Sequence, residues 1–412
     1  MPSVLLAGAF GQRNPGDDAL LDAFVRELPG WSCVATSCEP ARTAARHGVA
    51  AVQSRAPRQV AGALRHADGL VLAGGTVFKT LPEGGARHPH ALLRNAVALA
   101  AAARLLGRRV ALVGVGAGRL GDPGARRLAR LLVRCADLLV LRDEESAETL
   151  AAAGAPTPFR VGADAAWPLV GAPAALPPRP RRDGAIVVAV GRHGGEAALA
   201  GRLAKALAAV SAAAPAVPAT ADGAGRSADG AGPSAGAVGA AAPPLVRVQP
   251  WQVGDGGEDA VGLDDESHAH LLATALRRRS LPVEVVPPPA TLLDARDLVA
   301  GARLVVATRF HATVAAAAAG VPFLAVAHEQ KLAGLARRLG QPAVPADAPT
   351  PVLAAALTEA LSRPPAARAA VERQLDAARD GFRLLRLLLT RGAADEGDDV
   401  GALPLAPAGW AA

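Results

Sequence analysis

Short apolar runs alternate with helix-like segments along most of this chain, and this alternation restricts the possible folds more than any other feature. Ser3–Ala9 has the composition of a buried strand, and Asp17–Glu27 that of a helix with acidic residues in its first turn. The same order recurs downstream, where Val110–Val115 precedes Asp122–Cys135. Such alternation is typical of a parallel sheet with helices on both faces. The sequence therefore predicts an α/β fold.

The length of 412 residues exceeds one ordinary core and predicts two domains of about 150–200 residues. We expect two doubly wound, Rossmann-like domains facing a cleft, with C-terminal helices packing back on the N-terminal domain. The expected segments are an N-terminal α/β domain at 1–172, a linker at 173–184, a C-terminal α/β domain at 185–345, helices at 346–391 and a flexible tail at 392–412. Within the second domain, residues 212–244 are rich in Ala, Gly, Pro and Ser and are predicted to be a disordered insertion.

Composition excludes several functions. The net charge is +7, but the arginines are scattered and aromatics make up only 3% of the chain, so no basic stripe with stacking residues indicates nucleic-acid binding. The three cysteines form no disulfide or metal-binding pattern, and we expect no metal and a reducing, cytoplasmic location. We read neither a signal peptide nor an apolar run long enough to cross a membrane.

The strongest candidates for a chemical role directly follow one predicted strand. The run Leu304–Ala307 reads as a strand and is followed by Arg309 and His311, after which the alanines from Ala312 to Ala319 read as a helix. An arginine offers a rigid, charged fork for a phosphate or carboxylate. An imidazole two residues away can exchange a proton near neutral pH. The pattern predicts a site for a small phosphorylated or carboxylated substrate.

Other candidate residues follow strands of the first domain, where ligands bind in open α/β sheets. Gly74 and Gly75 would let backbone N–H groups approach a ligand. Asn14 and Asp17 lie in a glycine-rich turn, and Arg142 begins a helix after a strand. Helix capping and tight-turn roles account for these residues equally well.

Three further candidates come from later in the chain. Asp164 follows a short strand, where capping is again an alternative. Arg192 follows the strand Ile186–Val190 and could form a two-point anion clamp with Arg309. Lys331 is one of only three lysines in a chain that otherwise uses arginine, which hints at a need for a compact ammonium group.

Taken in order, these elements resemble the polysaccharide pyruvyl transferase family. The resemblance covers roughly Val4 to Gly340, apart from the insertion, and is most specific in Thr308-Arg309-Phe310-His311. The other matching elements are Asn14-Pro15-Gly16-Asp17-Asp18-Ala19-Leu20-Leu21, Gly74-Gly75, Arg142-Asp143-x-x-Ser146, Asp164, Ala319-Gly320-Val321-Pro322 and Lys331. One departure is Ala327-His328, where the family often has an aromatic residue before the lysine-bearing turn.

The resemblance implies a GT-B-like fold and transfer of a pyruvyl group from phosphoenolpyruvate to a sugar of a cell-surface polysaccharide or its lipid-linked precursor, forming a cyclic ketal. It places the acceptor on the N-terminal domain and phosphoenolpyruvate, a co-substrate and not a cofactor, on the C-terminal domain. Arg309 and His311 then match the donor-binding and acid residues, and Arg192 a second anion-binding arginine. A lipid-linked acceptor would bring the protein to the inner face of the membrane as a peripheral protein.

Two other functions fit the same architecture. One is a glycosyltransferase that uses a nucleotide sugar, which would need a site for a base and a diphosphate. The other is a catalytically inactive homologue that acts as a binding subunit, although Arg309 and His311 are both present.

Overall fold

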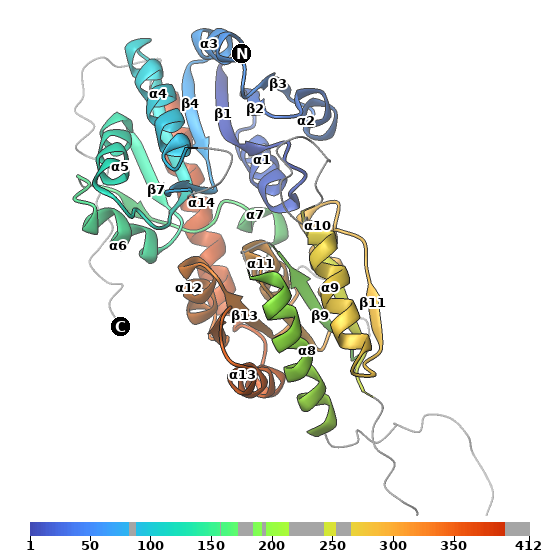
Figure 1. The fold of residues 1–412 in the computed structure, drawn as a ribbon. Helices are drawn as coiled ribbons and strands as arrows, with labels where there is room; N and C mark the ends of the chain where they lie inside the picture. The colour runs from blue at the N-terminus through green and yellow to red at the C-terminus, as the bar shows by residue number, and fades with distance from the viewer. Residues whose placement is uncertain are drawn as a thin grey trace, which may run out of the picture.

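The computed structural model describes residues 1–81, 88–156, 158–171, 184–191, 195–213, 243–252 and 265–391. Two α/β domains lie one above the other in Figure 1, each built on a parallel sheet with helices on its faces. The predicted fold class is therefore confirmed. The predicted boundaries at 172 and 185 stay predictions, because residues 172–183 lie outside the described part of the chain.

The N-terminal sheet has the strand order β3-β2-β1-β4-β6-β7-β8, with β5 paired to β6. Its strands are β1 (Ser3–Phe10), β2 (Ser32–Ser37), β3 (Ala50–Gln53), β4 (Gly69–Ala73), β5 (Thr76–Phe78), β6 (Arg109–Ala117), β7 (Leu138–Leu141) and β8 (Arg160–Val161). Its helices are α1 (Pro15–Glu27), α2 (Pro40–His47), α3 (Pro57–His66), α4 (Ala91–Leu105), α5 (Pro123–Cys135), α6 (Glu144–Ala152) and α7 (Trp167–Val170). The first strand, β1, pairs in parallel with both β2 and β4, so the strand order reverses there.

The C-terminal sheet has the order β11-β10-β9-β12-β13-β14 and reverses at β9. Its strands are β9 (Ile186–Val190), β10 (Val246–Pro250), β11 (Val283–Val285), β12 (Leu304–Ala307), β13 (Phe323–Ala327) and β14 (Ala343–Pro345). Its helices are α8 (Glu196–Ala213), α9 (Asp265–Arg277), α10 (Leu292–Val299), α11 (Phe310–Ala318), α12 (Gln330–Arg338) and α13 (Thr350–Ser362). In open α/β sheets, ligands bind beyond the strand ends at such reversals.

Local sequence explains the two helices that open at these reversals. In α1, Asn14 caps the first turn by accepting from the backbone N–H of Gly16, and Pro15 occupies the first helical position. In α11, every residue from Ala312 to Ala318 is buried. Small side chains let this helix pack closely between its neighbours, and Gly320, at φ +64°, ends the turn that follows it.

The two domains share an apolar core. One contiguous cluster of buried residues runs from the N-terminal sheet through Trp167 and Phe310 to the C-terminal sheet. The last helix, α14 (Arg368–Arg391), contributes Phe382 to this cluster and packs on β6, β7 and α7. Figure 1 shows α14 extending behind both domains, as the sequence predicted for the C-terminal helices. Its neighbour α13 instead packs on α8 within the C-terminal domain.

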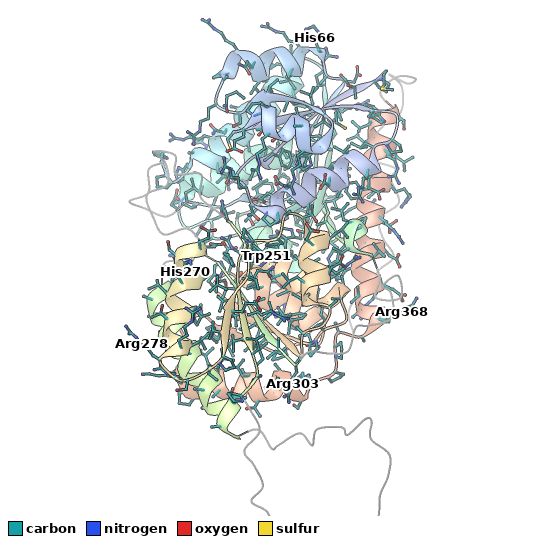
Figure 2. The ribbon with its side chains drawn as sticks, turned by 90° about the vertical axis from the view of Figure 1, so that its right-hand side faces the viewer. His66, Trp251, His270, Arg278, Arg303 and Arg368 are labelled. Carbon is teal, nitrogen blue, oxygen red and sulfur yellow. The ribbon has the colours of Figure 1, made fainter. Side chains whose placement is uncertain are left out.

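Figure 2 places buried Trp251 at the level where the two domains meet, His270 on the outer side of α9, and Arg278 just beyond the end of that helix. None of the described helices is long and apolar enough to cross a membrane.

Two details differ from the sequence-based expectation. Helix α11 begins at Phe310 and not at Ala312, because Arg309 has an extended backbone (φ −109°, ψ 134°) and Phe310 is buried at the domain junction. His311 therefore lies in the first helical turn. Helix α8 continues to Ala213, two residues into the segment predicted to be disordered. Residues 214–242, which make up most of the rest of that segment, and the tail 392–412 lie outside the described residues.

The Phe382→Ala variant tests the packing of α14. The Phe382 ring is fully buried, and its centroid lies 4.9 Å from that of Phe24 in an edge-on arrangement. We expect the substitution to lower the free energy of unfolding by about 3–5 kcal/mol, since the cavity cannot close fully. Urea unfolding followed by tryptophan fluorescence measures it. Arg383→Ala, at an exposed position of the same helix, should change it by less than about 0.5 kcal/mol; equal effects would contradict the packing.

A candidate active site between the two domains

The strand ends of the two domains face each other at the junction. Gly16 lies in the first turn of α1, which follows β1, and His311 lies in the first turn of α11, which follows β12. A Cβ atom placed on Gly16 would lie 2.1 Å from Nδ1 of His311, which is closer than any real contact. The imidazole of one domain therefore rests directly on the backbone of the other. Glycine is required at position 16 for this contact.

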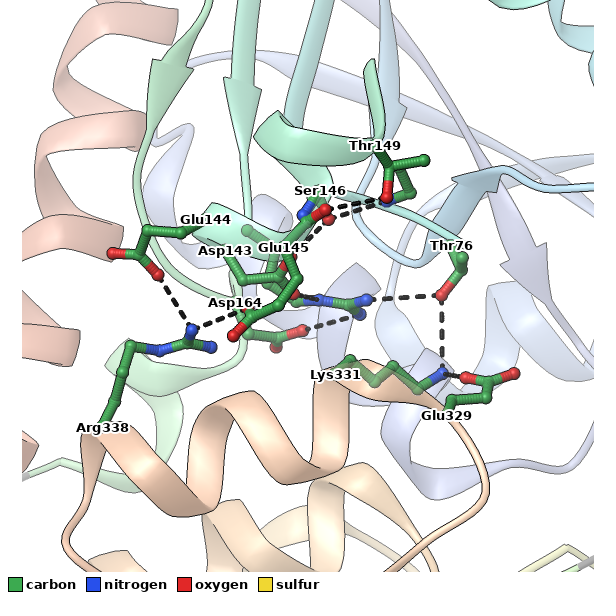
Figure 3. Close-up of polar contacts among 12 residues, drawn as sticks. Thr76, Asp143, Glu144, Glu145, Ser146, Thr149, Asp164, Glu329, Lys331 and Arg338 are labelled. Carbon is green, nitrogen blue, oxygen red and sulfur yellow. Dashed lines mark hydrogen bonds and ion pairs between the residues drawn. The ribbon is translucent and has the colours of Figure 1, made fainter. Parts of the chain in front are cut away.

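A buried carboxylate of the N-terminal domain also meets His311. Asp164 lies between β8 and α7 with only 1% of its surface exposed. Its Oδ1 is 3.4 Å from Nε2 of His311, and its Oδ2 is 3.6 Å from Nη1 of Arg142. Figure 3 shows Asp164 at the domain boundary, where its carboxylate pairs with Arg142. Three titratable groups from different elements thus form one interdomain cluster.

Arg142 is fixed on several sides. Its Nε donates to Oδ2 of Asp143 (3.1 Å), its Nη2 to Oγ1 of Thr76 (3.3 Å), and its Cζ lies 4.7 Å from the centroid of the Phe310 ring. Gly116 leaves room for it, because a Cβ there would lie 2.1 Å from Nη2. Arg142 is only 3% exposed, so its charge is stabilised by carboxylates instead of by water.

The two carboxyls beside Arg142 remain ionised. Burial raises the pKa of Asp164, but the charges of His311 and Arg142 outweigh burial and lower that pKa below its ordinary value. The pKa of Asp143 is lowered in the same way: burial opposes ionisation, while Arg142 and hydrogen bonds from Ser146 favour it. Asp143 also accepts from the backbone N–H of Ser146 and so caps α6.

Arg309 is held by a carboxylate of its own domain. Its Nε and Nη2 donate to Asp265, with the shortest contacts at 2.6 Å, and Nη2 is 3.5 Å from Oε1 of Gln252. Asp265 is fully buried and also accepts from the backbone N–H of Gln252 at 2.8 Å. The Nη1 donors of Arg309 have no hydrogen-bond partner within the described chain. They are the part of the fork that a ligand can use.

Lys331 extends the cationic side of the site. Its Nζ forms an ion pair with Glu329 and lies 3.5 Å from Oγ1 of Thr76, the hydroxyl that Arg142 also contacts (Figure 3). Burial, together with the charges of Arg142 and Lys79, lowers the pKa of Lys331 although Glu329 opposes this shift. Burial raises the pKa of Glu329, but Lys331 prevails and lowers it to about 2.

Asp17 is the carboxyl on which the basic groups of the C-terminal domain converge. Burial raises its pKa above the ordinary value, while the charges of His311, Lys331 and Arg309 act in the opposite direction without cancelling that effect. The amide of Asn14 donates to its Oδ2 at 2.8 Å. A carboxyl with a raised pKa whose ionisation responds to three basic side chains is suited to proton exchange.

The structure brings most of the predicted site residues together. His311, Arg309, Lys331, Asp17, Arg142 and Asp164 lie at the junction, and Asn14 supports Asp17. Gly74 and Gly75 both have positive φ (68° and 73°), and Gly74 is packed against the side chain of Leu20. Arg192 lies outside the described residues, so the proposed clamp with Arg309 stays a prediction.

Sequence reasoning missed several members of the site. These are Gly16, against which the His311 imidazole packs, and Thr76, Gly116, Gln252, Asp265 and Glu329. Thr76 directly follows Gly74-Gly75, and Gly16 lies within the motif quoted above, so both carried a positional signal. Asp265 carried none, since its contact with Arg309 depends on how α9 is placed against β12.

Solved structures with similar folds share low sequence identity with this chain. UDP-GlcNAc 2-epimerase from Neisseria meningitidis, bound to UDP-GlcNAc, matches with a TM-score of 0.56 at 9% identity, covering 95% of this chain and 100% of that one. HepE from Anabaena, in complex with UDP and glucose, gives 0.56 at 13% identity with the same coverage. The epimerase from Methanocaldococcus jannaschii gives 0.55 at 10% identity, again covering 95% and 100%. These similarities show a GT-B-like fold and nothing about the substrate.

Comparison with curated proteins found no match. A profile of the family described as polysaccharide pyruvyl transferase matches residues 14–214 and 249–330, which is more than half of the chain. The matched segments contain Asp17, Arg142, Asp164, Arg309 and His311 and end one residue before Lys331. On this basis, the chain belongs to the polysaccharide pyruvyl transferase family.

Proposed function

We propose that this protein transfers a pyruvyl group from phosphoenolpyruvate to a sugar of a polysaccharide or of its lipid-linked precursor, forming a pyruvate ketal. Family membership supports the reaction class. The donor and the acceptor are proposals that rest on the chemistry of the interdomain site.

The observation that carries the proposal is the convergence of three basic side chains of the C-terminal domain on Asp17. His311, Arg309 and Lys331 are all close enough to Asp17 to influence its ionisation. Phosphoenolpyruvate carries a phosphate and a carboxylate on three carbons, so it needs several cationic contacts in a small space. The free Nη1 edge of Arg309 fits one of these anionic groups, and the ammonium group of Lys331 fits the other.

The proposed reaction begins with proton transfer. His311, as imidazolium, donates its proton to the methylene carbon, and the electrons of the double bond form the new C–H bond. The resulting cationic centre is attacked by one sugar hydroxyl, the C–O bond to phosphate then breaks, and a second hydroxyl closes the ketal. One hydroxyl proton restores the imidazolium and the other leaves with phosphate. Asp17 is proposed to accept the proton of the first attacking hydroxyl and to pass that proton to the departing phosphate, a transfer that its raised pKa favours.

The acceptor is proposed to bind on the N-terminal side of the junction, near Gly75. A Cβ placed on Gly75 would meet no heavy atom within 4 Å, so the backbone is approachable there. A lipid-linked acceptor would bring the protein to the cytoplasmic face of the membrane as a peripheral protein.

The variants His311→Ala and Arg309→Ala test the catalytic assignment. Loss of a general acid typically lowers the rate by about 10²–10⁴-fold, so we expect a loss in this range for His311→Ala and a raised KM for phosphoenolpyruvate in Arg309→Ala. Phosphate release in the presence of sugar diols, with mass spectrometry of the products, measures both. The matched controls are His270→Ala, at an exposed position of α9, and Arg278→Ala, at the exposed residue that follows this helix. Parent-like rates in the first pair would refute the assignment.

Ligand-dependent thermal stability separates the proposed donor from nucleotide sugars. A ligand present at about 100 times its Kd stabilises a protein by about 2.7 kcal/mol. We therefore expect phosphoenolpyruvate to raise the Tm, and UDP- and GDP-sugars to leave it unchanged at the same concentration. Differential scanning fluorimetry provides the comparison, with Arg309→Ala as the variant that should not respond. A rise with a nucleotide sugar alone would favour a glycosyltransferase instead.

A further inference from the structure

Asp164 contacts the imidazole that the proposed reaction uses, yet it belongs to the other domain. Its Oδ1 faces Nε2 of His311 at 3.4 Å, and that nitrogen is buried with no hydrogen-bond partner in the described chain. A separation of 3.4 Å is long for a hydrogen bond, as is common for catalytic contacts before a ligand is bound. Asp164 is thus the anionic group available to this edge of the ring.

The opposite edge of the ring has a different environment. Nδ1 occupies the space that a Cβ on Gly16 would fill, at the beginning of α1. The ring plane is fixed by Phe310, which meets it edge-on at a centroid distance of 5.4 Å and an interplanar angle of 88°. Phe310 in turn lies against the Arg142 guanidinium. Nε2 of the imidazole therefore lies near the buried carboxylate of Asp164, and Nδ1 lies against Gly16, the residue before Asp17.

Charged groups from both domains surround His311. The β8–α7 loop presents Asp164, α1 presents Asp17, and the β7–α6 junction presents Arg142, which is itself paired with Asp143 and Asp164. Arg309 and Lys331 face the same region from the C-terminal domain. Asp164 is ionised, whereas Asp17 is the carboxyl whose burial favours the neutral form.

We propose that Asp164 is a positioning residue: it engages Nε2 of His311 across the domain junction and stabilises the imidazolium form of the ring that delivers the proton to the donor. This inference rests on the proposed function for the delivery step, but the pairing itself does not. Because the two residues come from different domains, the proton donor is complete only where the N- and C-terminal domains meet.

The test uses NMR titration of the full-length protein labelled at histidine, with His311→Ala to assign the signal. In Asp164→Asn, we expect the imidazolium signal of His311 to be lost about one pH unit lower than in the parent, since an opposite charge within about 4–6 Å shifts a pKa by about 1–3 units. Asp122→Asn is the matched control. Asp122 lies 2.8 Å from His90 on the surface, so this variant should shift only the His90 signal.

A second pair of variants covers the case in which Asp164→Asn does not fold. Asp164→Glu and Asp164→Gln have equal length and differ in charge, so the His311 signal should titrate about one pH unit lower in the glutamine variant. Superimposable His311 titrations within either folded pair would overturn the proposal.

Kinetics then separates this inference from the proposed function. If the parent forms the ketal, the alkaline limb of its kcat/KM profile should move about one pH unit lower in Asp164→Asn, because the acid must be protonated to act. An unmoved limb would overturn the positioning role even with an impaired rate. If the parent forms no ketal while the titration shift is present, the proposed function fails and the His311–Asp164 pairing stands.

Discussion

Asp164 is an ionised carboxylate with 1% of its surface exposed, and its charge must be balanced by side chains because water cannot reach it. Arg142 provides this balance from the same domain and His311 from the other. The arrangement of the junction follows from that requirement. Gly116 makes room for the guanidinium, Gly16 makes room for the imidazole, and the Phe310 ring contacts both groups.

The apolar pattern was sufficient to predict the fold class, because buried parallel strands such as β4, β9 and β12 are uninterrupted apolar runs. It was not sufficient for the stretch from β2 to α3. There the strand Ala50–Gln53 has no large apolar residue except Val52, and α2 buries only Thr43. These elements are specified by pairing with β1 and β2, and this tertiary information has no local signal.

The candidate site was predictable to a similar extent. Arg309, His311 and Lys331 could be singled out, since arginine and histidine at a strand end and a rare lysine are visible in one sequence. Their partners could not, because Asp265, Glu329 and Thr76 acquire a role only through the packing of α9, α12 and β5. Capping was offered as an alternative for Asp164. Both Asp164 and its neighbour in the cluster, Asp143, accept backbone N–H groups while also forming ion pairs. The chemical roles of all these residues stay predictions.

The contact between Arg309 and Asp265 has a consequence for the order of events. Both residues belong to the C-terminal domain, so their geometry would survive a change in the angle between the domains, whereas the His311–Asp164 pair would be separated. Under the proposed function, recognition of the donor and its activation are therefore housed in separable parts of the molecule. The C-terminal domain could then bind the enol phosphate while His311 is not yet paired with Asp164. The donor would react only after the domains meet around an acceptor.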